Sequence, residues 1–197
     1  DEFIAGPTVE KFEQTWSNHV QAQSCAAVGN GTFAVTLALL ACGIKPGHEV
    51  ITTAHTFVST AEAIKVIGAK PVFVDIDEYY HIDATQIQQK ITHNTKAILF
   101  VDLYGQTPNI DDLKQIAKTN NLFLIEDAAH SAGAEYKNQR VGNLVDLTCF
   151  SFNPIKNLGA IGDAGAVTGN KDLIDRVKMY RDHGRKTKYD YETIGFN

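Results

Sequence analysis

Short apolar runs alternate with segments of helical periodicity along the whole chain. Nearly continuous apolar runs are typical of strands that are buried on both faces of a sheet. Strands alternating with helices predict an α/β fold, in which a mostly parallel sheet carries helices on both faces. The seven runs cover residues 25–28, 50–53, 71–74, 97–101, 122–125, 147–152 and 165–168. The helical segments cover residues 9–20, 33–42, 57–67, 83–90, 111–119 and 171–181, with Thr8 expected as the first cap.

No internal repeat, low-complexity tract or linker divides the chain, so we expect one domain over residues 1–197. A composition of 44% hydrophobic and 21% charged residues is typical of a globular domain with a substantial core. The net charge of -5, without clusters of Lys and Arg, argues against a nucleic-acid partner. No stretch approaches the roughly 18 apolar residues of a membrane span, and no secretory signal is visible.

The cysteines and histidines predict neither a disulfide framework nor a metal site. Cys25, Cys42 and Cys149 are odd in number and far apart, which favours small buried thiols in a reducing cytoplasm. The seven histidines show no spacing typical of metal ligands, so we expect no metal. The expected location of the protein is therefore cytoplasmic.

Ligands of open α/β sheets bind beyond the carboxyl ends of the strands, so the residues that follow each apolar run are informative. The first run leads into Gly29-Asn30-Gly31-Thr32, ahead of a helical segment. The glycines allow close backbone approach, and the start of a helix offers unpaired N–H groups to a phosphate. The Thr32 hydroxyl would add a donor. An ordinary turn with a threonine cap is the alternative interpretation.

The same segment also matches G-x-G-x-x-A, a variant of the dinucleotide-binding fingerprint. That fingerprint needs an acidic residue at the end of the next strand, about twenty residues further on. The next run instead ends in Thr53-Ala54-His55, and Glu49 lies at its opposite end. A dehydrogenase is therefore disfavoured.

Two other strand ends add an aromatic ring and a carboxylate. Phe57 follows the second run, where it would stack on a planar ligand or enter the core with the next helix. The fifth run leads into Glu126-Asp127-Ala128-Ala129-His130. An acid at this place either faces a ligand or caps the next turn.

Lys156 lies among small and apolar residues shortly after Ser151, with no charged residue within six positions on either side. A lysine amine that is kept from water is deprotonated more readily and is then a nucleophile. The alternative is a surface loop in which the lysine stem packs on apolar groups. Both interpretations remain open from this segment alone.

One cofactor requires these four groups together. Pyridoxal phosphate binds a lysine through its aldehyde, a carboxylate through its pyridine nitrogen, an aromatic ring through its face and a helix start through its phosphate. Their convergence at one edge of a sheet is therefore more informative than any single match.

With these groups the chain resembles the DegT/DnrJ/EryC1/StrS sugar-nucleotide aminotransferases, which are fold type I pyridoxal-phosphate enzymes. The resemblance covers essentially all 197 residues. Its most specific segments are 151–166, SFNPIKNLGAIGDAGA, and 126–133, EDAAHSAG. Supporting segments are Gly31-Thr32, Thr56-Phe57, 181–184 and 195–197.

The resemblance implies a role for each matching residue. Lys156 would be the Schiff-base lysine, and Asp127 would pair with the pyridine nitrogen. His130 would bond the ring hydroxyl and Phe57 would stack on the ring. The phosphate ligands would be Gly31, Thr32, Ser151 and, from a partner subunit of a homodimer, Asn197. Asn153 belongs to the expected cofactor-binding set, although relatives often have His or Tyr there, and Ala164 replaces a common glycine.

The implied activity is transfer of an amino group from L-glutamate to a keto-sugar nucleotide. Lysine at position 156 favours transamination, because a branch of the family with histidine there performs dehydration. The sugar would be a 3-keto- or 4-keto-6-deoxyhexose, linked to dTDP or UDP, and the wording 156–160, KNLGA, leans towards the 3-keto class. The alternatives are another fold type I reaction and a regulatory or binding module without turnover. A desulfurase would need a mobile cysteine, whereas Cys149 lies in a predicted strand.

The resemblance also has implications for architecture. The chain would be the large, three-layer α/β/α domain that binds the cofactor. Family members are about twice as long, so the smaller C-terminal domain would be absent from residues 1–197.

Overall fold

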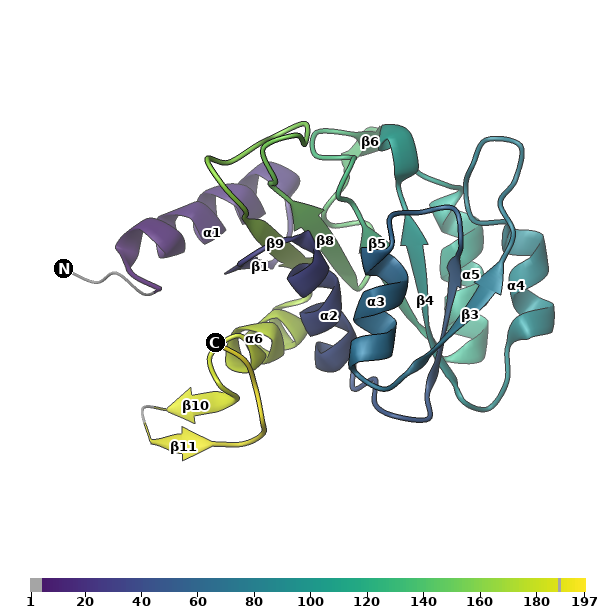
Figure 1. Ribbon diagram of the computed structural model, residues 1–197. Coiled ribbons are helices and arrows are strands. Elements are labelled where there is room, and N and C mark those ends of the chain that lie inside the picture. The colour runs from purple at the N-terminus through teal and green to yellow at the C-terminus, as the bar shows by residue number, and fades with distance from the viewer. Residues whose placement is uncertain (1–4, 188) are drawn as a thin grey trace.

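The computed structural model describes residues 5–187 and 189–197 and has a seven-stranded sheet at its centre (Figure 1). The strand order is β1-β9-β8-β5-β4-β2-β3, and helices pack on both faces of this sheet. The predicted α/β/α layers are therefore confirmed. The strands are β1 (Ser24–Val28), β2 (Glu49–Thr53), β3 (Lys70–Val74), β4 (Thr95–Val101), β5 (Phe123–Asp127), β8 (Leu147–Ser151) and β9 (Gly165–Gly169).

Strand direction brings most strand ends to one edge of the sheet. β2 pairs in parallel with β3 and β4, β4 with β5, and β5 with β8. β9 runs antiparallel to both of its neighbours, β1 and β8. The other six strands of the sheet consequently end at the edge where β9 begins, which we call the carboxyl edge. The loop from β8 to β9 stays at this edge and carries Lys156.

Helices cover the sheet in two sets. The helices α2, α3 and α6 share one core with the sheet, and α1, α4 and α5 share the other. In Figure 1, α2 and α3 lie in front of the sheet and α5 lies behind it. The helices are α1 (Pro7–Val20), α2 (Gly31–Ala41), α3 (Ser59–Val66), α4 (Ala84–Lys90), α5 (Ile110–Asn120) and α6 (Lys171–Tyr180).

The central strand β4 shows why the apolar runs are continuous. Ala97 and Leu99 face the core of α2, α3 and α6, whereas Ile98 and Phe100 face the opposite core. Successive side chains of a strand point to opposite faces, so a strand covered on both sides needs an apolar residue at every position. The three cysteines are also buried and free, as predicted.

Two helices, α1 and α2, begin two residues earlier than the sequence predicts. α1 starts at Pro7 after Gly6, so Thr8 lies in the first turn and is not the cap. Proline is favoured at this position because its fixed φ suits a helix start and it has no N–H to satisfy. α2 starts at Gly31 because the Asn30 side chain accepts a hydrogen bond from the Phe33 N–H at 2.8 Å. Thr8, the expected cap of α1, is therefore not a cap, and neither is Thr32, the cap in the alternative interpretation of the first turn.

Several short elements are absent from the sequence prediction. They comprise strands of two or three residues and a single 3₁₀ turn, which are too short to show a period. Residues 1–4 and 188 of the expected domain lie outside the described residues. The short elements are β6 (Glu135–Tyr136), β7 (Gln139–Arg140), β10 (Arg185–Thr187), β11 (Asp190–Tyr191) and η1 (Leu103–Gly105).

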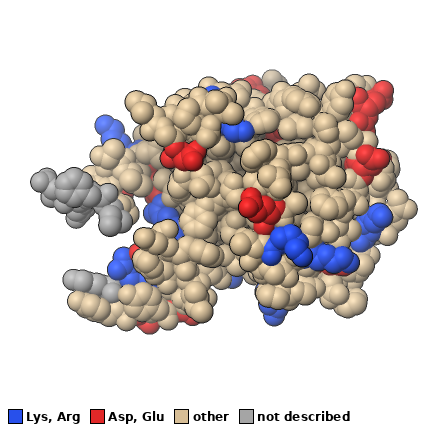
Figure 2. Space-filling view, viewed as in Figure 1, with Lys and Arg blue, Asp and Glu red and all other residues tan. Residues whose placement is uncertain are grey.

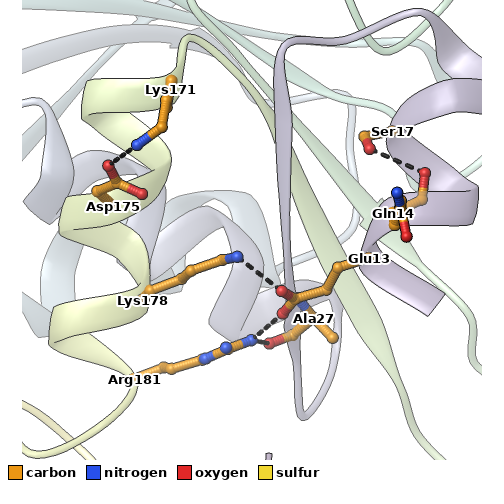
Figure 3. Close-up of polar contacts among 8 residues, drawn as sticks. All are labelled: Glu13, Gln14, Ser17, Ala27, Lys171, Asp175, Lys178 and Arg181. Carbon is orange, nitrogen blue, oxygen red and sulfur yellow. Dashed lines mark hydrogen bonds and ion pairs between the residues drawn. The ribbon is translucent and has the colours of Figure 1, made fainter. Parts of the chain in front are cut away.

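A buried carboxylate fastens α1 to α6 and β1 (Figure 3). Glu13 accepts hydrogen bonds from the Ala27 N–H at 2.9 Å and from Arg181 at 2.5 Å, and Lys178 approaches it to 2.7 Å. Arg181 also donates to the Ala27 carbonyl at 2.6 Å. Burial alone would raise the pKa of Glu13, but these donors outweigh it and lower the pKa. The carboxylate therefore stays ionised inside the protein.

Charged side chains of both signs lie on the face shown in Figure 2, and several Lys and Arg lie near one another at its lower right. Among the described residues, no helix combines the length and the apolar character needed to cross a membrane.

Candidate active site

A cleft of about 810 Å³ opens at the carboxyl edge of the sheet. Its walls come from the start of α2, the loop ahead of α3, the end of β5 and the loop between β8 and β9. Both its place and its volume are typical of ligand sites in α/β proteins. The lining includes eight of the predicted site residues, namely Gly31, Thr32, Phe57, Asp127, His130, Ser151, Asn153 and Lys156.

The start of α2 forms one end of the cleft. Asn30 caps this helix and occupies the Phe33 N–H, while the Asn30 carbonyl accepts from the Ala34 N–H at 3.0 Å. The first N–H groups of a helix have no partner within it, and they carry the positive end of the helix dipole. The N–H groups of Gly31 and Thr32 therefore remain available to an anion in the cleft.

Gly31 allows α2 to approach β8 closely. A Cβ at position 31 would lie 2.7 Å from the Cβ of Ser151 and 3.1 Å from its Oγ. Real Cβ atoms do not approach neighbours so closely, so any larger residue would push the helix away from the strand. The absence of a side chain thus brings the Ser151 hydroxyl beside the first turn of α2.

Asp127 ends β5 with its side chain on the α3 side of the sheet. Its Oδ2 accepts from the Thr60 hydroxyl at 3.1 Å, and its Oδ1 accepts from the Ala129 N–H at 3.2 Å. Asp127 therefore both caps the following turn and lines the cleft, so the two interpretations of this acid hold together. Burial raises the pKa of Asp127, against the opposing effects of these hydrogen bonds and of Lys156.

Thr60 is a site residue that sequence reasoning missed. It is wholly buried in α3, and its hydroxyl also hydrogen-bonds Thr56 at 2.9 Å, which makes a chain from Thr56 through Thr60 to Asp127. No local pattern indicates this contact, because Thr56 lies in the loop ahead of α3 and Thr60 lies in its first turn. This chain holds the Asp127 carboxyl in a single orientation.

Lys156 lies in a loop that turns tightly around Asn153. The Lys156 N–H donates to the Asn153 carbonyl at 2.9 Å, and the Asn153 side chain donates to Asp163 at 2.7 Å. Lys156 is half-buried and lines the cleft, whereas the neighbouring Ile155 is 88% exposed. The apolar sequence predicts that Lys156 is kept from water. In the structure Lys156 is only partly shielded, because its apolar neighbours point to solvent.

Phe57 and His130 lie on other walls of the cleft. Phe57 is 68% exposed, which excludes the alternative that it belongs to the core of α3. His130 is half-buried, and burial together with the nearby Lys156 lowers the pKa of its imidazole. A neutral imidazole can both donate and accept a hydrogen bond.

Asn197 is the one predicted residue that lies elsewhere. It lines a second cleft of about 1320 Å³ between α1, α6 and the C-terminal segment, visible as the hollow at the left of Figure 2. Its neighbour Phe196 reaches the first cleft and packs edge-on against Phe33 at 5.3 Å. The role of Asn197 in a partner subunit stays a prediction. Cations in the wall of the second cleft are Arg176, Lys178, Arg181, Arg185 and Lys186.

Two further acids, Asp102 and Glu126, are buried on the opposite face of the sheet from Asp127. Asp102 accepts from the Ser131 hydroxyl at 2.7 Å, and Glu126 accepts from the Thr148 hydroxyl at 2.7 Å. Their remaining oxygens, Asp102 Oδ1 and Glu126 Oε1, are buried without a further partner in the described structure. Burial raises the pKa of Asp102 well above its ordinary value and that of Glu126 to about 7.

The described residues include no cluster of His, Cys, Asp and Glu that is arranged to hold a metal ion. The groups that converge in the first cleft are an amine, a carboxyl and an anion cradle. They are equipped to bind an anionic, planar molecule and to move protons.

Comparison with known proteins gives one family. The model of the DegT/DnrJ/EryC1/StrS aminotransferase family matches residues 1–197. The chain is 45% identical over 197 residues to the pleiotropic regulatory protein of Geobacillus stearothermophilus, which covers 99% of this chain and 53% of that protein. It is 41% identical over 198 residues to the UDP-2-acetamido-2-deoxy-3-oxo-D-glucuronate aminotransferase of Pseudomonas aeruginosa, with 100% and 55% covered. The chain thus spans about half the length of the curated relatives it matches.

The chain also superposes closely on solved structures. DesV of S. venezuelae, in complex with a ketimine intermediate, superposes with a TM-score of 0.93 at 39% identity, covering 98% of this chain and 52% of DesV. NtdA of Bacillus subtilis, with bound cofactor PMP, superposes with a TM-score of 0.92 at 36% identity, covering 98% and 44%.

Proposed function

Because the chain belongs to the DegT/DnrJ/EryC1/StrS aminotransferase family, we propose that it is the cofactor-binding large domain of a pyridoxal-phosphate-dependent sugar-nucleotide aminotransferase. The proposed reaction moves the amino group of L-glutamate to the keto carbon of a sugar nucleotide and releases 2-oxoglutarate. The sugar is a 3-keto- or 4-keto-6-deoxyhexose linked to dTDP or UDP. The observation that carries the proposal is the convergence of Lys156, Asp127 and the start of α2 in one cleft.

The residues of the cleft fit this cofactor. The free N–H groups of Gly31 and Thr32 and the Ser151 hydroxyl suit a phosphate, and the exposed Phe57 ring suits a planar partner. Among the described residues, no cation lies in hydrogen-bond contact with Asp127, so a protonated pyridine nitrogen would supply its counter-charge. When bound, pyridoxal phosphate supplies an aldehyde that reacts with amines and a ring that withdraws electrons from the reacting carbon.

Each residue then has a stated task. The Lys156 amine attaches the cofactor between turnovers, and its freed Nζ takes the proton from the α-carbon of glutamate. In the second half-reaction, the same Nζ delivers a proton to the former keto carbon of the sugar. Asp127 holds the pyridine nitrogen protonated, His130 bonds the ring hydroxyl, and Asn153 shapes the loop that carries Lys156.

We further propose a cytoplasmic homodimer with shared sites. Asn197 lies outside the cleft of its own chain, so the proposed phosphate contact is made in the site of a partner subunit. Mixing Asn197→Ala subunits with Lys156→Ala subunits tests this arrangement. If sites are shared, the mixed dimers regain part of the activity that both parent proteins lack, whereas unshared sites show no recovery.

The central test uses the complete gene product, pyridoxal phosphate and L-glutamate. Formation of 2-oxoglutarate and borohydride-dependent attachment of the cofactor at Lys156 are expected, and both are expected to disappear in Lys156→Ala. Identical trapping in the variant and the wild type would exclude Lys156 as the attachment site.

The proposed function has two alternatives. One relative is named a pleiotropic regulatory protein, which keeps a module without turnover as the second candidate. Such a module need not keep both Lys156 and Asp127, and both are present here. Sugar-nucleotide binding by a colourless protein that takes up no pyridoxal phosphate would favour the module. A different product from glutamate and keto-sugar nucleotides would favour another fold type I reaction.

A further inference from the structure

Three aromatic rings gather at the carboxyl edge, beside the cleft. His55 follows β2, Tyr80 follows β3, and Tyr104 lies in η1 after β4. These strands are neighbours in the sheet. The His55 ring stacks on that of Tyr80 at a centroid distance of 5.5 Å, and the rings of Tyr80 and Tyr104 meet edge-on at 5.8 Å. We call these three residues the aromatic cluster.

The cluster is kept at the surface at a cost in free energy. Tyr80 and Tyr104 are 52% and 62% exposed, so burial in the core does not account for them. Both have left-handed backbones, with φ of 69° and 61°, a conformation that is unfavourable for residues other than glycine. Strained residues that persist at a surface concentrate at binding sites.

Tyr104 connects the cluster to Lys156. A hollow of about 300 Å³ is lined by Tyr104, His130, Ile155, Lys156 and Asn157. Three of these, His130, Ile155 and Lys156, also line the main cleft. A substrate whose reacting carbon lies at Lys156 can therefore extend through the hollow towards the aromatic rings.

We propose that the aromatic cluster is the subsite for the base of the nucleotide-linked substrate, whose sugar enters the hollow beside Lys156. This inference rests on the proposed function, because it assumes a substrate with a flat base at the end opposite to the sugar. Exposed aromatic rings stack on bases of any identity, since every base presents a π-face. The subsite therefore binds the nucleotide without selecting strictly between uracil and thymine.

Binding of UDP and dTDP to the cofactor-loaded, complete gene product tests the subsite by calorimetry, with pyrophosphate as the probe that lacks a base. Tyr80→Ala is expected to weaken both nucleotides about 5- to 100-fold and to leave pyrophosphate unchanged. Tyr104→Ala is expected to act in the same direction. Tyr80→Phe keeps the ring and is expected to bind the nucleotides as the wild type does.

Tyr79→Ala is the matched control. Tyr79 is adjacent and 61% exposed, but its ring lies near His81 at 6.3 Å rather than in the cluster. Its substitution is expected to leave nucleotide affinity unchanged.

Three results would overturn the inference: unchanged nucleotide affinity in both alanine variants, an equal loss for pyrophosphate, or dissociation of the oligomer by Tyr80→Ala, which would make the rings a subunit contact. The proposed function is judged separately, by 2-oxoglutarate formation from glutamate in the wild type. If one of these three results is found while the wild type still forms 2-oxoglutarate from glutamate, only this inference is refuted and the proposed function stands.

Discussion

Two groups of buried carboxyls differ in what surrounds them. Glu13 lies at the margin of the sheet between α1, β1 and α6, where Lys178, Arg181 and the Ala27 N–H lower its pKa. Asp102, Glu126 and Asp127 lie near the centre of the sheet, where their hydrogen bonds come from hydroxyls and a backbone N–H, and burial raises their pKa values. The comparison teaches that partners, and not burial alone, decide the charge of an interior acid.

The difference also separates Glu13, which stabilises the fold, from Asp127, which faces the cleft. Glu13 has its counter-charges inside the protein, so its ion pairs join elements far apart in the sequence. Asp127 borders a cleft, so a cationic group that enters the cleft can supply its counter-charge. The following predictions test this contrast.

The largest expected effect is on turnover by Asp127→Asn. The amide keeps the shape of the side chain but removes the charge that holds a protonated pyridine nitrogen. We expect the rate of 2-oxoglutarate formation to fall at least about 100-fold, while some pyridoxal phosphate still binds. Normal turnover in this variant would exclude the assigned role.

Glu13→Gln tests the other group through stability. Removing one partner of a buried ion pair leaves the remaining charges without compensation, so we expect a loss of about 3–5 kcal/mol in the free energy of unfolding. Urea unfolding measures it. The matched control is Asp175→Asn in the exposed pair with Lys171, also drawn in Figure 3, where no measurable loss is expected. Equal losses would refute a special role for Glu13.

The two groups should respond to pH in opposite directions. The pKa of Glu126 is raised from 4.5 to about 7, so the native state keeps a proton that the unfolded state loses, and stability falls as pH rises through this window. Glu126→Gln should flatten that fall, by on the order of 3 kcal/mol at most. The contribution of Glu13, whose pKa is lowered, is present above 4.5 and is lost as pH falls through its native value. A stability that falls with pH as steeply in Glu126→Gln as in the wild type would contradict the raised pKa of Glu126.

The smallest effect is expected from Lys178→Met. The Lys178 side chain is 35% exposed and Arg181 still compensates Glu13, so we expect a loss of about 1 kcal/mol or less. Arg181→Met should cost more, because Arg181 also donates to the Ala27 carbonyl. A reversed order in urea unfolding would show that Lys178 is the main partner.

Much of the site could be predicted because it follows strand ends. Gly31, Asp127 and Lys156 each come shortly after an apolar run and Ser151 lies at the end of one, and parallel strands bring such positions to one edge. The support of the site could not be predicted. Thr60 reaches Asp127 across 67 positions, a contact that depends on how α3 packs against β5.

The aromatic cluster shows the same limit. His55, Tyr80 and Tyr104 are unremarkable in sequence, because nothing local indicates that three loops will meet. Their meeting depends on the strand order β4-β2-β3.

The sequence by itself determined the layers, the strand runs and the identity of the groups at the carboxyl edge, because periodicity and turn chemistry are local properties of a chain. Only the tertiary structure decided that β9 reverses direction, that Asn30 rather than Thr32 caps α2, and that Asn197 lies outside its own cleft. It also decided which buried acids meet cations and which are surrounded by uncharged donors. These features depend on the distances between residues remote in sequence, and those distances are set by the packing of the whole domain.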